Sequence, residues 1–205
     1  MRQTAKHSLR AFSRGAAMAL AGLIAGLSPA EPLQAGPLAD AAAKAEEKSA
    51  SGDSKAAFDI MREAFGDFSE SLPFTVSLAT FVSEKPPAYG AYSARSSAIF
   101  KRGEPIVTYL ELIGLTWNEV GKEKQQANFT VDLQLADSKG DTLAEQKGFG
   151  NFTFTGHVRN QEIFTHLTLD VSGAAAGDYV LRYIVNDVYG GHSAPVELPF
   201  TIATQ

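Results

Sequence analysis

The sequence predicts a mainly β protein: an antiparallel β-sandwich of seven to eight strands, preceded by a short helical hairpin. From residue 71 onward, short stretches of alternating apolar and polar residues recur about every ten residues. Glycine, aspartate and serine cluster between these stretches, as expected of turns. No helical period lies between them, which favours an antiparallel sandwich over a parallel sheet with crossover helices.

Residues 1–35 have the pattern of a secretory signal peptide. Basic residues precede the apolar run 15–27, and small residues follow it. The run is shorter than the roughly 20 residues that a membrane-spanning helix needs. We expect cleavage after Ala35, with Ala30 and an uncleaved anchor as the alternatives. Cleavage predicts a periplasmic or extracellular protein with no stable membrane insertion.

Cysteine content and charge narrow the class further. The chain has no cysteine, which excludes a lipoprotein and disulfide stabilisation. An exported domain without disulfides is more typical of a bacterial cell envelope than of a eukaryotic secretory route. The net charge of −5 argues against a basic patch for nucleic acid. Stability must therefore come from a hydrophobic core.

Residues 36–70 predict a helical lead-in of two helices. Alanines favour the first helix, Gly52 breaks it, and Asp53 or Ser54 caps the second. This hairpin weakly resembles a tetratricopeptide-type hairpin, but no second copy is visible and such repeats need neighbours. The second helix carries an apolar stripe, which we expect to pack on the β domain or on another chain. Its members are Ala57, Phe58, Met61, Ala64, Phe65 and Phe68.

Residues 71–205 contain the expected strands of the sandwich. A shift of apolar positions predicts a bulge at Gly148 and Gly150. Pro199 lacks a ladder donor, so the last strand is expected to lie partly at a sheet edge. The expected strands cover residues 72–81, 106–113, 129–135, 142–155, 163–171, 179–185 and 196–202.

The segment 174–202, AAAGDYVLRYIVNDVYGGHSAPVELPFTI, resembles the last two strands of bacterial immunoglobulin-like and fibronectin type III-like domains. The resemblance implies an immunoglobulin-like β-sandwich in which Tyr179 makes the corner hydrogen bond. Leu181 stands where antibody domains carry a cysteine. The strand 129–135 also lacks the tryptophan of antibody domains. The resemblance implies a fold and no particular function.

No motif for catalysis or cofactor binding is visible. The sequence has no Gly-x-Ser-x-Gly elbow and no glycine-rich phosphate-binding loop. Asp137 and Asp141 resemble part of a calcium loop, but the intervening lysine favours a plain turn. We therefore predict a protein that is not an enzyme and holds no cofactor or metal. The alternatives that stay open use the dispersed histidines His157, His166 and His192 or paired carboxylates among Glu104, Glu111, Asp132 and Asp170.

Aromatic residues in loops are the remaining candidates for binding. Trp117, in the polar interruption 114–126, is the best candidate for a contact surface. The leading hypothesis is an exported, non-catalytic module of the bacterial envelope that contacts another protein. The alternative is a carbohydrate-binding module in which loop aromatics stack on sugar rings. The expected partner is thus an envelope protein or a glycan, and the expected contact residues are Trp117, Tyr89, Tyr92, Tyr189, Phe58, Met61 and Phe65.

Overall fold

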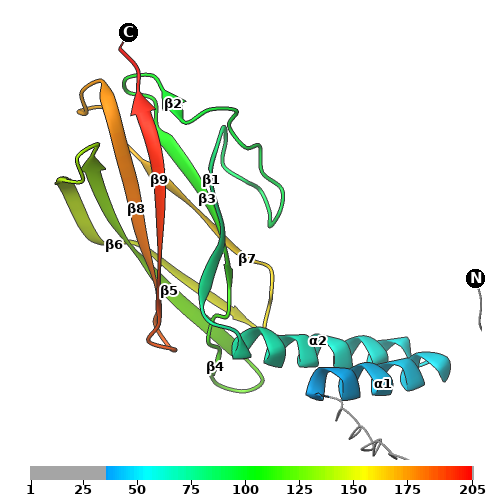
Figure 1. The fold of residues 1–205 in the computed structure, drawn as a ribbon. Coiled ribbons are helices and arrows are strands. Elements are labelled where there is room, and N and C mark those ends of the chain that lie inside the picture. Colours follow the sequence, from blue (N-terminus) through cyan, green and yellow to red (C-terminus); the bar gives the residue numbers. More distant parts are fainter. Residues whose placement is uncertain (1–35, 205) are drawn as a thin grey trace, which may run out of the picture. The chain divides into compact units, whose positions relative to one another are not determined.

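A computed structural model describes residues 36–204, so the expected signal peptide lies outside the described residues. Within that range, two helices come before a mainly β domain (Figure 1). The helices are α1, Pro37–Ala50, and α2, Ser54–Ser71. The strands are β1 Thr75–Val82, β2 Ile99–Phe100, β3 Ile106–Ile113, β4 Asn118–Glu119, β5 Gln125–Asp137, β6 Thr142–Gly156, β7 Ile163–Leu169, β8 Gly177–Asp187 and β9 Ser193–Ile202.

Helices α1 and α2 form the expected hairpin. Gly52 takes a φ of +85°, a backbone conformation that suits glycine and reverses the chain. The Asp53 side chain accepts a hydrogen bond from the backbone N–H of Ala56 at 3.0 Å, so the predicted cap of the second helix is confirmed. Ala45 is buried between the helices, where its small side chain allows close packing.

The strands form two sheets that share one core. The smaller sheet has the order β1-β3-β7, and the larger has the order β2-β9-β8-β5-β4, with β6 also paired to β5. Neighbouring strands run antiparallel except β2 and β9, which are parallel. The predicted mainly β, antiparallel architecture is therefore confirmed.

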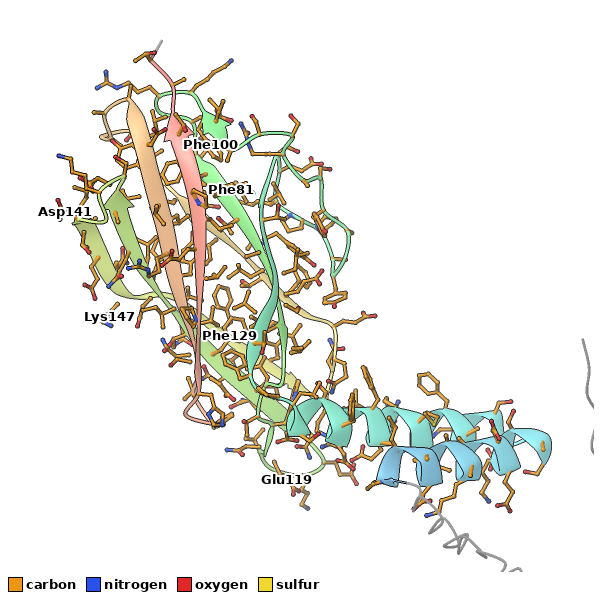
Figure 2. The ribbon with its side chains drawn as sticks, viewed as in Figure 1. Phe81, Phe100, Glu119, Phe129, Asp141 and Lys147 are labelled. Atoms are coloured by element: carbon orange, nitrogen blue, oxygen red, sulfur yellow. The ribbon has the colours of Figure 1, made fainter. Side chains whose placement is uncertain are left out.

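The core consists of the inward-facing residues of both sheets. The predicted alternation of 106–113 is confirmed, because Ile106, Leu110 and Leu112 are all buried. Phe129 of β5 is fully buried, and Phe81 packs edge-to-face on Phe100 with ring centroids 5.2 Å apart (Figure 2). Each such side chain contributes about 1.5–3 kcal/mol on burial.

Two predictions about strand irregularities are confirmed. The β5–β6 ladder shifts register between Val131 and Leu133, where Gly148 takes a φ of +59°. Strand β9 pairs with β8 along its length but meets β2 only at Thr201 and Ile202. Pro199 therefore lies on a side of β9 that is largely an open edge.

Candidate contact surface on the helical hairpin

The aromatic side chains of the α2 stripe are exposed. Phe58 is 65% exposed, Phe65 is 50% exposed and Phe68 is 42% exposed. Of the two expected alternatives, packing on the β domain is therefore wrong for these three residues, and packing on another chain stays a prediction. The side chain of Met61, in the same stripe, is half-buried.

The opposite, polar side of α2 meets the β domain instead. Arg159, in the β6–β7 connection, lies against Gly66, where a Cβ atom would come within 3.1 Å of the guanidinium. That guanidinium donates to Glu63 at 2.6 Å, Asp67 at 2.7 Å and Glu70 at 3.1 Å. These charge-assisted bonds hold the polar side of α2 at the β6–β7 connection, with Glu63 and Asp67 themselves 72% and 70% exposed, and the aromatic side is left facing solvent.

An apolar groove runs along the exposed face of the hairpin formed by α1 and α2. Its volume is about 1030 Å³. We call it the hairpin groove. It is open to solvent, because Phe58 and Phe65 on its wall are exposed. The groove is lined by Phe58, Met61, Arg62 and Phe65 of α2, by Leu38, Ala39 and Ala42 of α1, and at its base by residues 158–162.

Charged residues lie at both ends of the hairpin groove. Toward the hairpin tip, Asp59 pairs with Lys55 at 2.5 Å and with Arg62 at 2.8 Å. The hydrogen bond from Lys55 is the main cause that lowers the pKa of Asp59. The Arg62 guanidinium lies 5.5 Å from the centre of the Phe58 ring, a cation–π contact. Glu162 lines the base of the groove and is exposed.

Trp117 is buried, which contradicts its predicted role as an exposed loop aromatic. It is 9% exposed and belongs to the core shared by the two sheets. Its backbone N–H donates to Glu70 at 3.2 Å. Gly114 takes a φ of +74° and ends the alternation of β3, whose buried face carries Leu110 and Leu112, so the period of that strand alone would not place Trp117 inside. The polar part of the connection begins only with β4.

Tyr89 and Tyr92 lie half-buried on the segment that connects β1 to β2. Tyr92 stacks on Tyr109 with ring centroids 4.5 Å apart. The Tyr109 hydroxyl accepts from the Gly90 N–H at 2.8 Å and donates to Glu111 at 2.7 Å. Burial raises the pKa of Tyr109 to about 12. The stacking on Tyr109 makes Tyr92 part of the cover of the smaller sheet.

Tyr189 is also half-buried, and its hydroxyl donates to Gln126. Tyr89 and Tyr92 thus lie on the same connecting segment, whereas Tyr189 and Trp117 lie on other segments. The sugar-stacking hypothesis loses its main residue with the burial of Trp117.

The alternatives based on metals and carboxylates gain no support from the geometry. Among residues 36–204, no three histidine, aspartate or glutamate side chains gather as a metal site would require. Asp137 accepts from the N–H groups of Lys139 and Asp141, as a plain turn does. Glu104 binds Arg95 at 2.7 Å, and Asp170 accepts from the N–H of Ser172 at 2.8 Å.

In the described part of the chain, neither helix is long and apolar enough to cross a membrane.

Comparisons with known proteins do not indicate a function for this chain. No protein-family model matches the chain, and a search of curated proteins found no match. A family 123 glycoside hydrolase from Clostridium perfringens aligns over 65% of this chain with 9% identity and a TM-score of 0.38. An alkylpurine DNA glycosylase from Pseudomonas fluorescens aligns over 70% with 13% identity and a TM-score of 0.33. The aligned parts span 28% and 34% of those two chains.

Proposed function

We propose that this protein is an exported, non-catalytic immunoglobulin-like module of the bacterial cell envelope that acts through protein–protein contacts. The observation that carries the proposal is the exposed aromatic face of the hairpin, with Phe58 at 65% and Phe65 at 50% exposure. Monomeric proteins seldom leave a contiguous apolar patch uncovered unless it binds something. Large aromatic side chains in a groove are also the usual anchors of protein interfaces.

The strand order supports the immunoglobulin-like part of the proposal. The sheet β1-β3-β7 has the order of strands A, B and E, and β9-β8-β5-β6 has that of G, F, C and C′. The Tyr179 hydroxyl donates to the carbonyl of Ala175 at 2.8 Å, which is the bond of a tyrosine corner. Leu181 is fully buried where antibody domains hold a cysteine.

The export part of the proposal rests on the basic start, the apolar run 15–27 and the absence of cysteine. Expression of the full gene in a bacterium, followed by fractionation and N-terminal sequencing, tests it. We expect a mature protein in the periplasm or medium that begins at Gly36. An intact chain confined to the cytosol would refute export.

Capture from envelope extracts tests the contact role. The double variant F58S/F65S removes both exposed rings, and L143S removes an equally exposed side chain on β6 as a matched control. We expect wild type and L143S to retain the same bound protein and F58S/F65S to lose it. Equal binding by all three chains would exclude the hairpin groove as the contact surface. Binding to a glycan array in place of protein would favour the carbohydrate alternative.

A further inference from the structure

We propose that the hairpin groove binds a second copy of this chain, with the two hairpins antiparallel about a two-fold axis. This inference rests on the proposed contact role of the groove and names its occupant. A two-fold interface uses the same surface on both copies, so each groove must complement itself in shape and charge.

The shape of the groove meets this requirement. Phe58 and Phe65 are two helical turns apart on α2, roughly 10 Å, and both project from the face that the groove covers. A two-fold axis at the level of Met61 places Phe58 of each copy opposite Phe65 of the other. The alanines Ala39 and Ala42 line the α1 side with small side chains, which allows a second hairpin to approach closely. The result is a four-helix arrangement with the aromatic rings inside.

The charges at the two ends are complementary in the antiparallel arrangement. Lys55, which also pairs with Asp59 of its own helix, lies near the hairpin tip with a side chain 87% exposed, and Glu162 lies at the base of the groove. Among the ion pairs of the described residues, Glu162 takes part in none. Lys55 lies about 15 Å from Phe65 along the helix, on the tip side of Phe58. Because the axis sets Phe58 opposite Phe65 of the second copy, it brings Lys55 toward the base of the second groove, where Glu162 lies. The two-fold symmetry forms this contact between Lys55 and Glu162 twice.

Charge reversal distinguishes a second copy from any other occupant. The variants K55E and E162K each create two like-charge contacts between the copies, whereas K55E/E162K restores two attractive ones with the signs exchanged. Because K55E also loses the pair with Asp59 of its own helix, recovery in the double variant is the deciding result. We expect sedimentation equilibrium of the exported protein to show a monomer–dimer equilibrium. Each single variant should weaken it about tenfold, and the double variant should recover it. F58S/F65S should be monomeric, and L143S should dimerise like wild type.

A wild-type protein that stays monomeric at every concentration would overturn the inference. It would leave the proposed function standing if F58S/F65S still loses a bound envelope protein. A dimer that is insensitive to F58S/F65S would also overturn the inference, since the copies would then meet elsewhere. Single charge variants that weaken the dimer without recovery in K55E/E162K would refute the antiparallel arrangement.

Discussion

The guanidinium of Arg159 and the carboxylate of Glu70, 3.1 Å apart, join the helical hairpin to the β domain. The second oxygen of Glu70 accepts from the backbone N–H of Trp117 at 3.2 Å. One carboxylate thus connects the end of α2 to the β6–β7 connection and to the residues after β3. Because this joint uses the polar side of α2, the aromatic side is left facing solvent.

Replacing Arg159 with alanine should loosen the joint. The side chain of Arg159 is 13% exposed, and its loss leaves three carboxylates close together. Glu63 and Asp67 are solvent-screened, so we expect a loss of about 1–3 kcal/mol in the free energy of unfolding. Urea titration followed by the fluorescence of Trp117, the single tryptophan, measures it. Arg62→Ala, at a more exposed pair, should cost about 0.5 kcal/mol or less. Equal losses in the two variants would contradict the joint.

Two tyrosines of β8 should respond differently to removal of their hydroxyl groups. Tyr179→Phe loses the bond to the carbonyl of Ala175 and should cost about 0.5–1.5 kcal/mol. The hydroxyl of Tyr183 is buried near that of Thr108, and no well-formed hydrogen bond joins either hydroxyl to another of the described residues. Tyr183→Phe should therefore be neutral or stabilising. Thermal unfolding of both variants gives the comparison, and a larger loss from Tyr183→Phe would contradict this account of the corner.

Asp132 should make the protein sensitive to acid. The Gly148 N–H donates to its carboxylate at 2.8 Å, and this bond, helped by Asn186 and Lys147, holds the pKa of Asp132 below its usual range. A carboxyl with a lowered folded-state pKa stabilises the fold above its unfolded value, about 3.9. That stability is lost as pH falls through the folded value. Wild type should therefore exceed Asp132→Asn in stability at pH 6, with the gap closing toward pH 2. A gap that is constant with pH would contradict this.

Local sequence patterns predicted the strands, whereas the exposure of the α2 stripe depends on contacts between residues far apart in the sequence. The alternation of apolar and polar residues along 106–113 and 179–185 is a local property of each segment, so the buried faces of these strands could be predicted from the sequence. The direction of the α2 stripe depends on Arg159 binding Asp67 across 92 positions of the chain. A periodic pattern within the helix gives no information about that contact. The burial of Tyr92 likewise depends on Tyr109, which belongs to another strand.

Photo-crosslinking in living cells tests the contact role of the hairpin groove most directly. A photoreactive amino acid replaces Phe58 in one chain and Leu143 in a matched control, since these side chains are 65% and 55% exposed. We predict a discrete protein adduct from position 58 and none of comparable yield from position 143. Adducts of equal yield at both positions, or none at position 58, would contradict the assignment of the hairpin groove as a protein-binding surface.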